Sequence, residues 1–202
     1  MATINDVTIC NSALTKLGAE TILSLDDDTP SGIACKLRYN LVLDYVTSMH
    51  AWRFARTRVI LAPDLATPAF GYDNQFTLPS DYLSIFIASS DPNLDIRTAY
   101  LDRFAIEEGK LLTDESTVYL IYIRKLLSAD MPAVSVPFSE AVALYLATDL
   151  VMPITQSDTS KQMLLQQFNL ALKKAKTLDA RNDGPRSLQA NTFVDARIGI
   201  DS

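Results

Sequence analysis

The sequence is poor in the residues from which most metal and phosphate sites are built. It contains one histidine, His50, and two cysteines, Cys10 and Cys35, which do not form a Cys-x-x-Cys pair. A structural zinc site needs about four ligands of these types, so we expect no metal site. Only six glycines occur, and none of them belongs to a Gly-rich phosphate-binding loop. We therefore expect neither a metal nor a cofactor.

Long apolar runs are also missing. No stretch reaches the roughly 18 apolar residues that a membrane-spanning helix needs. Residues 1–8 lack the basic and apolar regions of a secretory signal peptide. The sequence therefore favours a protein made in the cytoplasm, with free thiols and no contact with a membrane.

Positive charge is in short supply. The 18 Lys and Arg residues are outnumbered by 24 Asp and Glu residues, which gives a net charge of -6. Tight wrapping of nucleic acid needs clustered basic residues, so this class of function is disfavoured. An acidic wall is still compatible with a channel through which DNA passes without specific binding.

What is present is an ordinary globular composition, 48% hydrophobic and 21% charged. The first part of the chain has helical periodicity. Thr3 and Asp6 have capping-box spacing and Gly18 is a stop signal, which predicts a helix over residues 4–17. A second helix is expected from about Pro30 to Ala51. Its inward stripe is predicted to comprise Ala34, Leu37, Leu41, Tyr45, Ser48 and Trp52.

Residues 57–128 have a different character, rich in Val, Ile, Tyr, Phe and Thr and interrupted by prolines. Glu108-Gly109 is typical of a hairpin turn. The segment predicts a small antiparallel sheet. Its strands are expected over residues 57–61, 74–78, 82–88, 98–106, 110–113 and 118–125.

Helical periodicity returns at Pro137. The third helix is apolar almost all round, which predicts that it is the most buried, and Pro153 is expected to end it. Ser157 or Asp158 then caps a fourth helix with a lysine-rich outer face. The inner stripe of the fourth helix is predicted to comprise Leu164, Phe168, Ala171, Ala175 and Leu178.

These segments predict an α+β protein that is mainly helical. Residues 1–56 and 130–181 are expected to form a discontinuous four-helix bundle. A small antiparallel β subdomain over residues 57–129 is inserted into it, and residues 182–202 form an extended C-terminal arm.

Two groups of residues are candidates for contacts with other molecules. Arg53, Arg56 and Arg58 are either solvated arginines of a surface strand or a contact with another subunit or a partner protein that pairs with carboxylates. The arm is either a frayed terminus or a segment that docks on another chain. Its apolar residues are Phe193, Val194, Ile198 and Ile200.

Other candidate chemistry is weaker. A nucleophilic Cys10 would need His50 beside it, and burial of Cys10 in a helix face is the alternative. The run Asp26–Asp28 lacks the alternation of a calcium loop and is expected to be a solvated loop. Glu107 and Glu108 lie in a predicted turn.

Several segments, in order, carry a family resemblance. They are ALTKLG at 13–18, AWRFAR at 51–56, FTLPSDYLSI at 76–85, EEGKLLTD at 107–114, IYIRKL at 121–126, and the apolar helix that begins at Pro137. From about Asn5 to Asp179 the chain resembles the tail tubular protein A family, the head-to-tail adaptors of short-tailed phages. No matched segment is a catalytic signature.

The resemblance implies a structural connector rather than an enzyme. Proteins of this kind form a twelve-subunit ring at the head-tail junction of the virion. The ring binds the portal protein on one side and a downstream tail or nozzle protein on the other, leaving a channel for DNA. The rival hypotheses are a hydrolase that uses Glu107, Glu108 or the Asp26 cluster, and a DNA-binding module.

Overall fold

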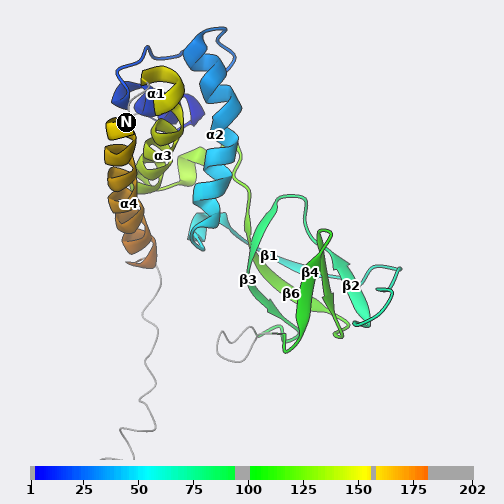
Figure 1. Cartoon of the computed structure of the whole chain (residues 1–202). Coiled ribbons are helices and arrows are strands. Elements are labelled where there is room, and N and C mark those ends of the chain that lie inside the picture. The colour runs from blue at the N-terminus through cyan, green and yellow to red at the C-terminus, as the bar shows by residue number, and fades with distance from the viewer. Residues whose placement is uncertain (1–2, 94–100, 156–157, 182–202) are drawn as a thin grey trace, which may run out of the picture.

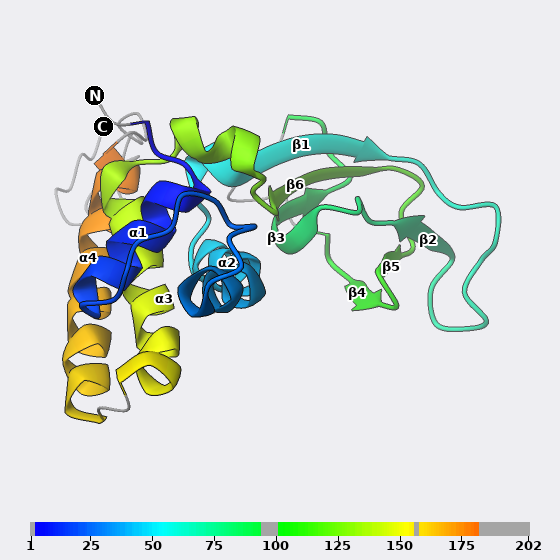
Figure 2. The same cartoon turned by 90° about the horizontal axis from the view of Figure 1, so that it is seen from above.

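The computed structural model describes residues 3–93, 101–155 and 158–181. The described chain is α+β, with a helical body and a β body that projects away from it (Figures 1 and 2). In chain order the elements are α1 (Asp6–Lys16), α2 (Pro30–Ser48), the 3-10 helix η1 (Arg53–Ala55), β1 (Arg56–Leu61), β2 (Asn74–Thr77), β3 (Tyr82–Ser89), β4 (Phe104–Glu107), β5 (Lys110–Thr113), β6 (Val118–Arg124), the 3-10 helix η2 (Ser128–Ala133), α3 (Val136–Thr155) and α4 (Asp158–Arg181).

The helical body is arranged around α3. Both views place α4 on one side of α3 and α2 on the other (Figures 1 and 2). The side chains of Phe138, Val142 and Leu146 are fully buried, as expected for a helix that is apolar almost all round. The main core therefore forms where α1, α2 and α4 meet α3.

The ends of α1 are fixed by hydrogen bonds within the chain. Asn5, not Thr3, is the N-cap, since its side chain accepts a bond from the Thr8 N–H at 2.8 Å and Thr8 Oγ1 accepts one from the Asn5 N–H at 2.9 Å. The predicted cap was two residues too early, because Asn and Thr at this spacing satisfy the same backbone groups. At the other end Gly18 adopts a φ of 67° and the Ala19 N–H reaches the Leu14 carbonyl, as in a Schellman motif.

The face of α2 that lies in the core differs from the predicted one. The buried residues are Cys35, Tyr39, Val42, Leu43 and Val46. Three residues of the predicted stripe, Leu37, Leu41 and Tyr45, lie on the exposed side instead. The prediction failed because α2 is apolar on both sides, so helical spacing fits two stripes equally well.

Gly32 is required by a close approach at the start of α2. Its N–H donates to the Thr29 side chain at 3.1 Å, and a Cβ at this position would collide with the carbonyl oxygen of Asp27. We expect Gly32→Ala to lower the free energy of unfolding by about 1–3 kcal/mol, although alanine favours helices. The exposed Asn40→Ala in the same helix is the control and should be neutral or slightly stabilising in urea denaturation. Equal stability of the two variants would contradict the steric argument.

The β body contains two antiparallel sheets of three strands, in the orders β1-β6-β3 and β2-β5-β4. The hairpin between β4 and β5 turns at Glu108 and Gly109, which both have positive φ values, as the Glu-Gly signal predicted. The strand expected over 98–106 is shorter: residues 101–103 are not part of a strand, β4 begins at Phe104, and 98–100 lie outside the described residues. The two sheets enclose a second core of their own.

Strand β6 joins the two cores. Val118, Leu120 and Tyr122 face the second core, while Ile123 belongs to the main core. Successive side chains of a strand point to opposite faces, so one central strand is buried on both sides. This double burial couples the β body to the helices.

Two details of the last helices differ from the sequence predictions. Pro153 does not itself end α3, which continues for two more residues to Thr155; a proline this close to the end of a helix interrupts only its last turn. Along α4, Leu164, Phe168 and Ala175 face inward as expected. Leu178 is 37% exposed, and Asp179 takes the inward position with 8% exposure. A carboxylate was not expected there.

Within the described residues, none of the helices is long and apolar enough to cross a membrane. The same part of the chain contains no group of three or more His, Cys, Asp and Glu residues placed to hold a metal ion.

Candidate interaction surfaces

The junction between the two bodies is built around Trp52, between α2 and η1. The Trp52 side chain has no exposed surface, and its Nε1 donates to the Val46 carbonyl at 3.2 Å. Its ring packs edge to face against Phe138 of α3, with ring centroids 4.9 Å apart. It also stacks on Phe54, with ring centroids 5.8 Å apart. The AWRFAR segment is therefore a structural joint, where aromatic packing fixes how the chain leaves the helices.

Asp179 ties the end of α4 to this joint. Its Oδ1 accepts the backbone N–H of Arg53 at 3.2 Å, and its Oδ2 lies 3.4 Å from His50 Nε2. His50 also meets Trp52 edge to face, with ring centroids 4.8 Å apart. His50 therefore packs into this joint, and its partner Asp179 is a residue that the predicted inner stripe of the fourth helix did not include.

The three candidate arginines are close in sequence but differ in environment. Arg53 and Arg58 are exposed, whereas Arg56 is half-buried. Arg56 Nε donates to the Ala51 carbonyl at 2.9 Å, and its guanidinium lies 4.1 Å from the centroid of the Phe86 ring. Arg56 thus links the α2 exit to the sheet. A contact of Arg53, Arg56 and Arg58 with another chain stays a prediction.

Arg56 and Arg58 form a matched pair on one face of β1. We expect Arg56→Ala to lower the free energy of unfolding by about 1–2 kcal/mol, because it removes a charged hydrogen bond and a cation–π contact. Arg58→Ala should change it by less than about 0.5 kcal/mol, as for an exposed residue. Chemical denaturation of both variants is the measurement. If Arg58→Ala costs as much as Arg56→Ala, the assignment of the joint to Arg56 is wrong.

A second link joins β6 to the segment that enters α3. Arg124 donates to both carboxylate oxygens of Asp130, each at 2.7 Å, and the Leu127 N–H adds a third bond at 2.8 Å. The Arg124 guanidinium and this N–H hold the pKa of Asp130 below its usual value.

The lowered pKa of Asp130 makes stability depend on pH. In the unfolded chain Asp130 takes up a proton at a higher pH than in the folded chain, so its contribution is complete above about pH 4 and is lost as the pH falls through the folded pKa. We expect Asp130→Asn to cost about 1 kcal/mol at pH 7 and less at about pH 3, below the ordinary pKa of an aspartate. Urea denaturation at both pH values tests this. A cost that does not change with pH would contradict the assignment.

Two apolar surfaces lie on the helical body, one on α2 and one on α4. The first, which we call the α2 stripe, consists of Ile33, Leu37, Leu41 and Tyr45 at four-residue steps; Leu37 is 68% and Leu41 61% exposed. Exposed large apolar residues are common singly, but a row of four along one helix indicates a contact surface.

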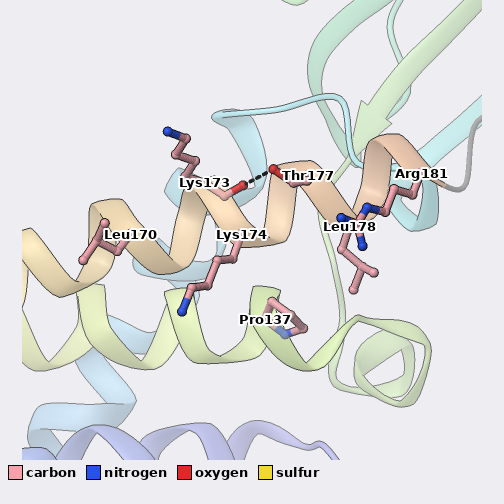
Figure 3. A pocket seen from close by; sticks show the side chains of 7 residues that line it. All are labelled: Pro137, Leu170, Lys173, Lys174, Thr177, Leu178 and Arg181. Carbon is pink, nitrogen blue, oxygen red and sulfur yellow. Dashed lines mark hydrogen bonds between the residues drawn. The ribbon is translucent and has the colours of Figure 1, made fainter.

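The second surface lies on α4. A groove of about 450 Å³ runs beside the C-terminal half of this helix (Figure 3). Pro137, Leu170 and Leu178 give it an apolar lining, and basic side chains lie along it. Met163 stands two turns before Leu170 on the same side and is 57% exposed. The α4 face is therefore defined as Met163, Leu170, Lys173, Lys174, Leu178 and Arg181.

The remaining candidates for chemistry have structural roles. Cys10 and Cys35 are both fully buried and lie side by side. The contact with Cys35 and the burial of the Cys10 thiol raise the pKa of that thiol. Asp27 Oδ2 accepts the N–H groups of both Leu23 and Ser24, which stabilises the fold of the loop before α2. The burial predicted for Cys10 is confirmed.

The carboxylates proposed for a hydrolase lie at the β4–β5 turn. Glu107 and Glu108 line a shallow groove of about 300 Å³ together with Phe70 and Tyr72. Both glutamates are exposed, and Lys110 nearby pairs with Asp64 at 3.0 Å. Neither glutamate has the buried setting that tunes a catalytic acid.

The apolar residues of the predicted arm, Phe193, Val194, Ile198 and Ile200, lie outside the described residues. Comparison with known proteins adds no identification: no protein-family model and no curated protein matches this chain.

Proposed function

We propose that the protein is a structural head-to-tail adaptor of a tailed phage. Copies of the chain assemble into a ring under the portal protein, twelve subunits in number as the family resemblance implies. The ring joins the capsid to a downstream tail or nozzle protein and surrounds the channel through which DNA passes. Its location is the head-tail junction of the virion.

The observation that carries this proposal is the α2 stripe. The helical body already has a complete core, yet Leu37 and Leu41 are each more than 60% exposed on the same helix. When a partner covers such a row, burial of the apolar surface stabilises the complex by roughly 25 cal/mol per Å² buried. A chain that has a filled core and also exposes a row of apolar side chains fits a subunit of an assembly.

The organisation into two bodies supports the same function. A ring subunit needs rigid side faces and parts that reach toward the neighbouring layers. Helices α1 to α4 serve as the rigid four-helix bundle, and the β body, which projects from the helices in Figure 1, reaches the tail side. The arm over 182–202 and the nearby end of the bundle meet the portal.

The segments behind the resemblance support a structural role. AWRFAR is the joint at Trp52, and EEGKLLTD is the β4–β5 hairpin. IYIRKL contains part of the strand that joins the two cores, with Ile123 and Leu126 in the main core. Each of these three segments serves packing or chain reversal, which supports a structural connector.

A virus that lacks the gene for this chain provides the functional test. We expect it to produce DNA-filled heads that carry no tails, with tailed particles restored when the chain is supplied from a plasmid. Normal tailed particles in its absence would contradict the proposal. A DNA-binding module would instead be revealed by strong, salt-dependent binding of the purified chain to duplex DNA.

A further inference from the structure

We propose that the α2 stripe of one subunit packs against the α4 face of the next copy, and that this contact closes the ring. The inference rests on the proposed ring-forming function and names the two surfaces that make it. It commits the α2 stripe to a second copy of this chain.

The two surfaces match in apolar content. The α2 stripe extends along about 18 Å of helix. It presents Ile33, Leu37 and Leu41, and at its end Tyr45, whose ring also packs against Tyr145 of the same chain and is 47% exposed. The α4 face presents Met163, Leu170 and Leu178, with Leu170 63% exposed. Two helices that carry apolar rows of this kind pack side by side by inserting the ridges of one into the grooves of the other.

Their charges are complementary. Helix α4 carries five basic and two acidic residues, in a chain whose net charge is -6. Of the two acidic residues Asp179 is buried, so the outer face of α4 is basic. Helix α2 and the loop before it together carry five acidic residues, Glu20, Asp26–Asp28 and Asp44, and two basic residues, Lys36 and Arg38, so this side has a net negative charge. Both basic residues already pair with a carboxylate of the same chain, Lys36 with Asp26 and Arg38 with Asp149. Such opposite charges favour this pairing over the pairing of two like faces.

The position of the surfaces decides the symmetry. Helices α2 and α4 lie on opposite sides of α3 (Figures 1 and 2), so the α2 stripe and the α4 face of the same subunit cannot contact each other. The contact joins different residues on its two sides, so it is heterologous. A heterologous contact repeats from copy to copy and ends only when a ring closes.

Cysteine cross-linking of full-length protein tests the pairing. Leu41→Cys on α2 and Leu170→Cys on α4 are made in separate chains; the native Cys10 and Cys35 are fully buried and leave only the new thiols exposed. The two variants are assembled together with the portal protein of the same virus and oxidised. We expect a disulfide-linked dimer in the mixed sample and none in either variant alone. A chain carrying both cysteines should give a ladder of higher oligomers.

Three outcomes would overturn the inference. Dimers in Leu41→Cys alone would show two α2 stripes face to face, an isologous contact. Cross-links from Leu41→Cys to the portal would give the stripe a different occupant. An assembled ring without any cross-link would place the subunit contact elsewhere while leaving the proposed function intact. If no portal complex forms at all, the proposed function itself fails.

A charge substitution gives an independent readout. Leu41→Glu should abolish ring assembly, while the variant keeps wild-type unfolding in urea because position 41 is exposed. Asn40→Glu, on the neighbouring exposed position, adds the same charge outside the stripe and should assemble. Assembly of Leu41→Glu at the wild-type level would also overturn the inference.

Discussion

Trp52→Ala should lower the free energy of unfolding by about 4 kcal/mol, the largest effect of any single substitution proposed for this chain. The substitution removes a fully buried indole that touches α3 through Phe138 and caps the Val46 carbonyl at the end of α2. It leaves a cavity at the point where the chain passes from the helices to the sheets. Small domains have only about 5–15 kcal/mol of stability, so a large part of it depends on this joint.

The measurement is urea denaturation followed by circular dichroism, since Trp52 is the only tryptophan and its fluorescence is lost with it. Trp52→Phe keeps most of the ring packing and loses the Nε1–H, so it should cost about half as much. Phe70→Ala removes an aromatic ring that is 88% exposed and should be nearly neutral. A Trp52→Ala protein within about 1 kcal/mol of wild type would contradict the role of the joint.

Asp179→Ala should cost about 2–3 kcal/mol. Its carboxylate is 8% exposed, accepts the Arg53 backbone N–H and lies beside His50. Alanine removes the acceptor of that N–H and the carboxylate beside the imidazole, and the loss of a partly buried hydrogen bond to a carboxylate is costly. The loss should appear as a lower denaturation midpoint with an unchanged slope.

Asp179→Asn separates the hydrogen bond from the charge. The amide oxygen can still accept from Arg53, so this variant should keep a good part of the stability that Asp179→Ala loses. Asp102→Ala, an exposed aspartate, is the control and should change stability by less than about 0.5 kcal/mol. If Asp179→Ala behaves like Asp102→Ala, α4 is not fastened to the joint through this residue.

Strand positions could be predicted from the sequence because local signals agreed. Around Glu108-Gly109, a turn that needs positive φ values stands between two short runs of β-forming residues, and the structure has β5 at the predicted residues 110–113. Pairing into two sheets with a core of their own was not predictable, because it depends on contacts between strands distant in sequence.

The surfaces were harder to predict than the elements. Helix α2 carries apolar residues on both sides, and only the position of α3 decides that Val42 and Val46 are inside while Leu37 and Leu41 are outside. Asp179 was missed for a related reason. Periodicity places apolar residues inward, and nothing local shows that a buried carboxylate will find a backbone N–H 126 residues away.

Mass-resolved light scattering of the full chain, alone and then mixed with the portal protein of the same virus, tests the central claim most directly. The structural adaptor predicts either a ring of the chain itself or a complex that contains one copy per portal subunit. A monomer that stays separate from the portal at every concentration would contradict the adaptor function and the α2–α4 contact together.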